Sequence, residues 1–174
     1  ASRGRVTGVE TLEEAASAAV RLALGQEVAE PPPVTLPGQE AARLGAGQRF
    51  LRGLFSGGTL CTEAQWVLRP YLGRVASNAP LDPADRTDGL GRDPGHVVLD
   101  LGGDAFTQGR LHPMIDPTLR LHRLEREADD PEVAVILLDV VLGFGADRDP
   151  AQRLAPVIAA ARERARAAGR YLCV

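Results

Sequence analysis

Short apolar segments alternate with longer segments of helical period from Gln48 onward, and this alternation limits the fold more than any other feature. The predicted strands cover 48–54, 96–101 and 133–140, with one more starting at 170; the predicted helices cover 60–72, 117–128 and 150–168. Helices between strands favour right-handed βαβ crossovers and a parallel sheet. We therefore expect an α/β fold with a three-layer, flavodoxin-like open parallel sheet.

The first strand of this series runs into a glycine turn and then a helix, with the sequence FLRGLFSGGTLCTE at 50–63. The turn comprises Ser56, Gly57, Gly58 and Thr59. Two glycines let a ligand approach the backbone closely, and the free N–H groups of a helix N-terminus favour negative charge. The turn predicts a site for a small-molecule phosphate or carboxylate. The alternative is a tight turn in which Thr59 caps the helix.

The N-terminal part of the chain has a different pattern. Residues 11–24 repeat Leu and Ala at helical spacing, start with a capping-box pair, Thr11 and Glu14, and stop at Gly25. Residues 26–47 are rich in proline and glycine and read as an extended linker. We expect a helix and Pro-rich linker over 1–47 and the flavodoxin-like domain over 48–174.

Aspartate precedes proline five times, and this pair is a strong helix start because Asp accepts from an orphan N–H while Pro has none to leave unpaired. For Asp116 and Asp149 this structural role is favoured over catalysis. The pairs begin at Asp82, Asp93, Asp116, Asp130 and Asp149. The segment 76–95, rich in Pro, Asp and Gly, is predicted to be a mobile loop.

Composition excludes several classes of function. The formal charge is −3 and all the basic residues other than histidine are arginine, so there is no nucleic-acid-binding stripe and no lysine for Schiff-base or Walker A chemistry. No apolar run is long enough for a membrane span, and we expect a cytoplasmic protein. Cys61 and Cys173 fit neither a disulfide framework nor a metal site; both are expected to be reduced and buried, with a reactive Cys61 at the helix start as the alternative.

Two basic residues follow the second long strand in a loop at the expected ligand edge of the sheet. Arg110 and His112 could face one anion, with Arg110 binding it bidentately. The alternatives are a loop histidine bonded to a backbone carbonyl and an Arg110 paired with Asp104 or Asp116. His96 and His122 are expected to be structural or solvent-facing.

Carboxylates also follow the predicted strands. Asp100 and Asp104 flank a Gly-Gly pair at a spacing that suits either a Mg²⁺ site or a turn that accepts N–H groups, and the turn is favoured, so we expect no metal. Asp139 ends the aliphatic strand, where a charge must be paired or functional.

Four segments occur in one order along the chain, and together they resemble the FdrA family. They are LFSGGTLC (54–61), DLGGDAFT (100–107), GRLHPMIDP (109–117) and VILLDVVLGFG (135–145). The family is acyl-CoA synthetase-like and similar to the α subunit of succinyl-CoA synthetase, and some members are implicated as oxamate carbamoyltransferase subunits. The resemblance covers 50–174. It implies an upstream CoA-binding-like domain or partner subunits, and a chain that is a fragment of a longer protein.

The resemblance also bears on mechanism. In succinyl-CoA synthetase-like α subunits a Glu in a Gly-Glu-Ile-Gly-Gly run orients the histidine that becomes phosphorylated. The matching run here, Asp139 to Gly143, lacks that Glu, and Asp139 is at best displaced by one position. Because one residue along a strand reverses the face, this argues against standard nucleotide-dependent CoA ligation.

Three hypotheses for the function follow. The first is acyl or carbamoyl transfer, with the turn at 56–59 binding phosphate and with Arg110, His112 and Asp139 as the catalytic residues. The second is succinyl-CoA synthetase-like, NDP-forming ligation. The third is a non-catalytic scaffold that docks partner subunits. We expect no cofactor in this fragment. CoA or a nucleotide could bind to the full-length protein, and the isolated domain is expected to be inactive.

Overall fold

A computed structural model describes residues 7–28 and 38–174 of the chain. The chain divides into two compact units, Ala1–Pro37 and Gly38–Val174, and each is described by itself. The predicted polyproline run at 31–33 lies outside the described residues. None of the helices within the described ranges is long and apolar enough to span a membrane.

Helix α1 (Leu12–Ala23) confirms the helix predicted over 11–24. Thr11 is the N-cap, and its Oγ1 accepts the Glu14 N–H at 3.2 Å. The Glu14 carboxylate accepts the Thr11 N–H in return at 3.4 Å. This reciprocal pair is the predicted capping box, which satisfies amides that the first helical turn leaves unpaired.

The sheet contains four parallel strands in the order β2-β3-β1-β4. Strand β1 (Phe50–Phe55) lies between β3 (His96–Asp100) and β4 (Val133–Leu138). The two-residue strand β2 (Val75–Ala76) was not predicted. The strand predicted from 170 is reduced to a single parallel bridge between Cys173 and Val135. The open parallel sheet confirms the predicted fold class.

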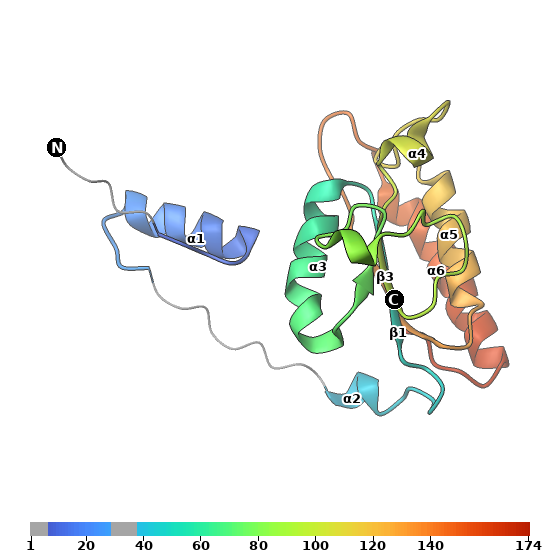
Figure 1. Cartoon of the computed structure of the whole chain (residues 1–174). Coiled ribbons are helices and arrows are strands. Elements are labelled where there is room, and N and C mark those ends of the chain that lie inside the picture. The colour runs from blue at the N-terminus through green and yellow to red at the C-terminus, as the bar shows by residue number, and fades with distance from the viewer. Residues whose placement is uncertain (1–6, 29–37) are drawn as a thin grey trace. The chain divides into compact units, whose positions relative to one another are not determined.

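Helices cover both faces of the sheet and make three layers (Figure 1). Helix α3 (Gly58–Leu72) lies on one face, and α5 (Thr118–Ala128) and α6 (Pro150–Ala167) lie on the other. Asp149 is the N-cap of α6 as predicted, but Pro117 rather than Asp116 occupies the cap position of α5. Three short helical segments were not predicted: α2 (Gly38–Ala41), the 3-10 turn η1 (Pro83–Asp85) and α4 (Asp104–Thr107).

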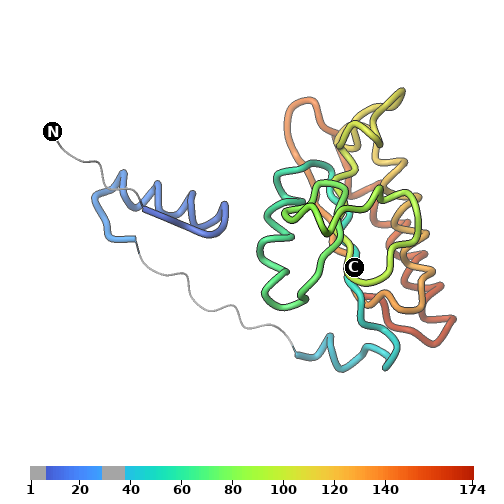
Figure 2. The backbone as a smooth tube through the Cα atoms, viewed as in Figure 1, coloured from blue at the N-terminus to red at the C-terminus, as the bar shows by residue number. Residues whose placement is uncertain are grey.

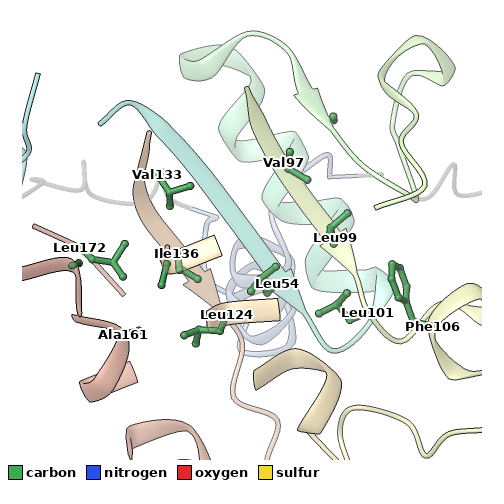
Figure 3. Close-up of a cluster of buried hydrophobic side chains, with 13 residues drawn as sticks. Leu54, Val97, Leu99, Leu101, Phe106, Leu124, Val133, Ile136, Ala161 and Leu172 are labelled. Carbon is green, nitrogen blue, oxygen red and sulfur yellow. The ribbon is translucent and has the colours of Figure 1, made fainter. Parts of the chain in front are cut away.

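The core divides along the sheet. Aliphatic side chains of β1, β3, β4, α5 and α6 form the larger cluster, in which Leu54, Leu124 and Ile136 meet (Figure 3). A smaller cluster beneath α3 contains Phe55, Cys61 and Val98. Burial of this apolar area is the main term that favours the folded chain.

A buried ion-pair network joins the central strand to α5. Arg52 of β1 donates from Nε to the Glu127 carboxylate at 2.7 Å, and Arg123 donates to the other Glu127 oxygen at 2.6 Å. Both arginines are almost completely buried. A charge in a central strand contradicts the usual apolar pattern, and its partner Glu127 lies 75 residues away in sequence.

Backbone hydrogen bonds join residues within the segment 76–95, which was predicted to be a mobile loop. Ser77 donates to the Asp85 carbonyl at 2.9 Å, and Thr87 donates to the Ser77 carbonyl at 3.0 Å. The buried Asp85 carboxylate also accepts from Arg74 at 3.0 Å. These bonds fix the shape of the connection that precedes β3.

His96 is predicted to give the fold a specific dependence on pH. Its Nδ1 accepts the Leu51 N–H at 3.1 Å, and burial, followed by the nearby Arg52 charge, lowers its pKa below 6.5. The contribution of the neutral ring to stability is therefore present above about pH 6.5 and is lost as pH falls through the folded-state pKa, because the unfolded chain binds the proton first.

Urea unfolding at a series of pH values from 7.5 to 5 measures this effect. The unfolding free energy of the His96→Gln variant should fall less over that range than that of the original chain. His122→Gln, at an exposed position on α5, is the matched control and should follow the original chain. Parallel pH profiles for the original chain and His96→Gln would contradict the assignment.

Candidate functional site

The carboxyl ends of the strands lie at one edge of the sheet, as parallel topology requires. Figure 2 shows the start of α3, the loop around α4 and the loop after β4 together at the upper end of the domain. Four polar residues stand at or just after the ends of the strands: Ser56, Asn78, Asp100 and Asp139. We call this edge the rim.

The glycine turn opens α3 without a side-chain cap. Gly57 is the N-cap residue, so the predicted alternative, a cap by Thr59, is wrong. Within the helix, the first N–H with a backbone partner is that of Cys61, which bonds to the Gly57 carbonyl at 3.3 Å. Among the described residues, the N–H groups of Gly58, Thr59 and Leu60 have no hydrogen-bond partner. Three donors at the positive end of a 15-residue helix are thus available to an anion.

Asp100 flanks this turn. Its Oδ1 accepts the Gly102 N–H at 2.9 Å, which is the turn interpretation rather than the metal interpretation of Asp100 and Asp104. Asn78 fixes the Asp100 backbone from both sides, at 2.8 and 2.9 Å. A Cβ on Gly58 would lie 3.2 Å from Asp100 Oδ2. The carboxylate therefore borders the turn and limits the size of the group that enters it.

His112 reaches the same turn across Gly102. A Cβ on Gly102 would lie 2.4 Å from the Ser56 carbonyl oxygen and 2.5 Å from His112 Nε2, so only glycine permits this approach. His112 Nδ1 accepts the Met114 N–H at 3.3 Å. The neutral imidazole consequently carries its proton on Nε2, the atom beside the turn.

Asp139 lies beneath the turn in a buried cluster with Ser56 and Arg120. Its carboxylate accepts the Ser56 N–H at 3.0 and 3.1 Å and the Ser56 hydroxyl at 3.1 Å. Arg120 Nη1 donates to Asp139 Oδ1 at 2.8 Å, and Nη2 donates to the Asp139 carbonyl at 2.5 Å. Burial lowers the pKa of Arg120, and the Asp139 charge acts in the opposite direction. Ser56 and Asp139 hence position the turn from below.

Sequence reasoning did not identify Arg120. A weak signal exists, since Arg120, Arg123 and Glu127 recur with Leu124 at helical spacing and all four are buried. Charged residues on the apolar stripe of a helix require partners inside the domain. Asp139 had been noted as a strand-end charge that needs a partner, and Arg120 is that partner.

Arg110 lines a cavity in which His112 takes no part. This cavity measures about 440 Å³, and His122 and Arg123 also line it. The predicted alternative pair with Asp116 is not formed, because Asp116 accepts from Arg153 at 3.1 Å. His112 thus lies next to the turn at 56–59, whereas the contacts of Arg110 are with the 440 Å³ cavity.

The cysteine alternative is also settled by burial. Cys61 is fully buried in the first turn of α3. Burial raises the pKa of its thiol to about 11, despite a contact with the Ser77 hydroxyl. Cys61 is a protonated core residue at neutral pH, and the position near the helix start does not make it reactive.

The family model described as CoA-ligase matches residues 54–171, from the end of β1 to the last residues of the chain. The chain belongs to the CoA-ligase family. At the family level it is a succinyl-CoA synthetase-like ligase domain, and the matched region contains the turn, His112, Arg120 and Asp139.

Two relatives place the domain in context. The chain is 48% identical over 133 residues to the uncharacterized protein YahF of Escherichia coli (strain K12), which covers 76% of this chain. The chain spans only about a quarter of that relative, 26% of its length. A match to the LexA repressor of Gluconobacter oxydans (strain 621H) is 29% identical over 108 residues, 56% of this chain and 43% of LexA, which is too little to assign a family.

The rim offers three amide donors at the start of α3, and three cavities lie on the same domain. The cavity between Ser56, Arg120 and Asp139 measures about 10 Å³. Cavities of about 440 and 620 Å³ are lined by residues other than those of the turn.

The buried cluster beneath the turn yields a prediction about stability. Asp139→Asn removes the charge that compensates the buried Arg120 and should lower the unfolding free energy by about 3–5 kcal/mol. Asp129→Asn is the matched control, because the Asp129 pair with Arg164 is exposed and should contribute less than about 1 kcal/mol. Urea unfolding measures both, and equal losses would show that Asp139 does not compensate Arg120.

Proposed function

We propose that the glycine turn binds an oxyanion of a phosphate or acyl-phosphate substrate, and that the chain is a domain of an FdrA-type, acyl-CoA synthetase-like protein that transfers an acyl or carbamoyl group. One observation carries the proposal: three unpaired amides stand at the start of α3, and at the same turn the Ser56 carbonyl oxygen and His112 Nε2 both lie within 2.5 Å of the place that a Cβ on Gly102 would take. Two further points support it: four segments resemble the FdrA family, and the CoA-ligase family model matches residues 54–171.

The chemistry follows from where charge develops. In acyl or carbamoyl transfer from a phosphate, the nucleophile forms a bond to the carbonyl carbon, the bond from that carbon to the phosphate oxygen breaks, and the phosphate leaves with the electron pair. Fixed N–H donors and a helix dipole stabilise the phosphate oxygens without reorganisation. His112 Nε2–H adds a donor on the other side of the turn.

Asp139 has a positioning role in this proposal. Its carboxylate binds the Ser56 amide and hydroxyl and the Arg120 guanidinium, which places Gly57 and Gly58 at the rim. A carboxylate with these partners is not directed at a histidine that would be phosphorylated. The phosphohistidine mechanism of succinyl-CoA synthetase-like ligation is therefore the second candidate, and it depends on groups outside this chain.

CoA or a nucleotide belongs to the full-length protein in this proposal. The rim fits one oxyanion, so an upstream CoA-binding-like domain or partner subunit would hold the rest of the substrate. A cytoplasmic location follows from the same substrates. Arg110, predicted as catalytic, does not contribute to the turn, since it lines another cavity.

The amide donors can be tested with two substitutions at one position. Gly58→Pro removes one of the three N–H groups while keeping a conformation that the first helical position favours, and Gly58→Ala adds a Cβ but keeps the N–H. On titration with carbamoyl phosphate, the backbone NMR signals of Gly58, Thr59 and Leu60 should shift saturably in the original chain. Affinity should fall at least about 10-fold in Gly58→Pro, for the loss of one charge-assisted hydrogen bond, and less in Gly58→Ala.

The same titration has outcomes that contradict the proposal. Shifts no larger than those caused by sodium chloride at equal ionic strength would leave the turn without a ligand, and the scaffold hypothesis would then be the better one. Equal affinities for Gly58→Pro and Gly58→Ala would show that the amides are not the donors.

Activity separates the two enzymatic candidates. The 174-residue chain alone should show no turnover, because in this proposal an upstream domain or partner subunit holds the rest of the substrate. Full-length YahF, with carbamoyl phosphate and oxamate, should release phosphate, whereas ligation would require CoA, ATP and succinate and would label a histidine from ATP. An acid-labile label in YahF would favour ligation, and turnover by the isolated chain would contradict the division of the site.

A further inference from the structure

A second hollow lies on the α5 side of the domain, apart from the turn and its chemistry. It measures about 440 Å³ and lies between the loop at 89–91, α4 and α5. This volume is within the range of small-molecule sites. Its lining includes the basic side chains of Arg110, His122, Arg123 and Arg126 and no carboxylate.

Two of these four side chains have no hydrogen-bond or ion-pair partner among the described residues. Arg123 is compensated by the Glu127 carboxylate at 2.6 Å, and Arg126 lies 3.7 Å from the same carboxylate. Arg110 and His122 are exposed, and neither side chain forms a hydrogen bond or ion pair within the part of the chain that the structure describes. Their donors are therefore available to a ligand without breaking an existing bond.

The wall of the hollow is preorganised by arginines. Arg126 donates to the Leu90 and Gly91 carbonyls at 2.8 and 2.7 Å, and Arg123 also bonds to the Gly89 carbonyl. Gly89 has φ +66°, and a Cβ there would lie 2.8 Å from Leu99 and 3.2 Å from Phe106. The loop is thus held close to the core, which lowers the entropy cost of binding.

The floor is apolar. Leu101 and Phe106 contribute buried side chains, and Leu119 adds a half-buried one. Cations at the mouth over an apolar floor select a molecule that carries a negative group on an apolar body. A concave site of this size favours a small molecule over an acidic protein surface.

We infer that this cavity binds a small organic anion, a carboxylate or phosphate monoester on an apolar body, with Arg110 and His122 contacting the anionic group. The inference is independent of the proposed function of the turn. Arg110, which the sequence assigned to catalysis, becomes a ligand-binding residue of this second site.

Isothermal titration calorimetry of the full chain with phenyl phosphate, benzoate and inorganic phosphate tests the inference. Phenyl phosphate or benzoate should bind at least about 10-fold more tightly than inorganic phosphate, because the floor buries the ring. Whichever of the two binds more tightly identifies the anionic group. Binding of inorganic phosphate as tight as that of both aromatic probes would overturn the role of the floor, and absence of binding by all three would overturn the site.

Substitutions locate the binding. Arg110→Gln should lower the affinity for the aromatic probe that binds more tightly by about 10-fold or more, since a hydrogen bond to a charged group is lost. His122→Gln should lower the same affinity to a smaller extent. Arg162→Gln is the matched control: it makes the same change in charge at an exposed arginine that lines the other, 620 Å³ hollow. Equal weakening by Arg110→Gln and Arg162→Gln would overturn the assignment.

NMR signals distinguish binding in this hollow from binding at the glycine turn. The NMR signals of Phe106 and His122 should shift with phenyl phosphate in both the original chain and Gly58→Pro. Shifts confined to Gly58, Thr59 and Leu60 would place the probe at the turn and overturn the second site. Circular dichroism of Arg110→Gln should match the original chain, because Arg110 is exposed.

Discussion

The Asp139 carboxylate is the constraint on which the rim depends. It stands at the end of β4, binds the Ser56 amide at the end of β1, and is compensated by Arg120 from α5. Three elements from different parts of the chain are thereby joined under one turn. Breaking one partner of a buried charged pair leaves the other uncompensated, so the cluster holds the turn in one position. The amides of Gly58 to Leu60 are available because the first turn of a helix leaves its N–H groups without intrahelical partners and Gly57 provides no side-chain cap.

Buried arginines organise both regions that we connect with ligands. Arg120 supports the glycine turn, while Arg123, paired with Glu127, supports the loop that borders the cavity of about 440 Å³. The guanidinium group suits this role because its planar fork bonds to a carboxylate and to backbone carbonyls at the same time. Helix α5 thus supplies one buried arginine to the rim and another to the hollow.

The alternation of strands and helices was sufficient to predict the parallel sheet, and the capping box and the N-cap at Asp149 were predicted from local rules alone. The short strand β2 was missed because two residues carry no periodicity. The partners of Arg52 and Asp139 were missed for a different reason. Ion pairs inside a domain join residues that are distant in sequence, so their geometry depends on tertiary packing. Arg110 was grouped with His112 because both follow a strand in one loop, and a shared loop does not fix which cavity each side chain lines.

A crystal structure of the chain with carbamoyl phosphate tests the central claim most directly. The account predicts phosphate oxygens within hydrogen-bonding distance of the Gly58 and Thr59 amides and of His112 Nε2, with Asp139 still bound to Ser56 and Arg120. A turn whose amides are instead occupied by the Asp100 carboxylate, with the phosphate bound elsewhere, would contradict it.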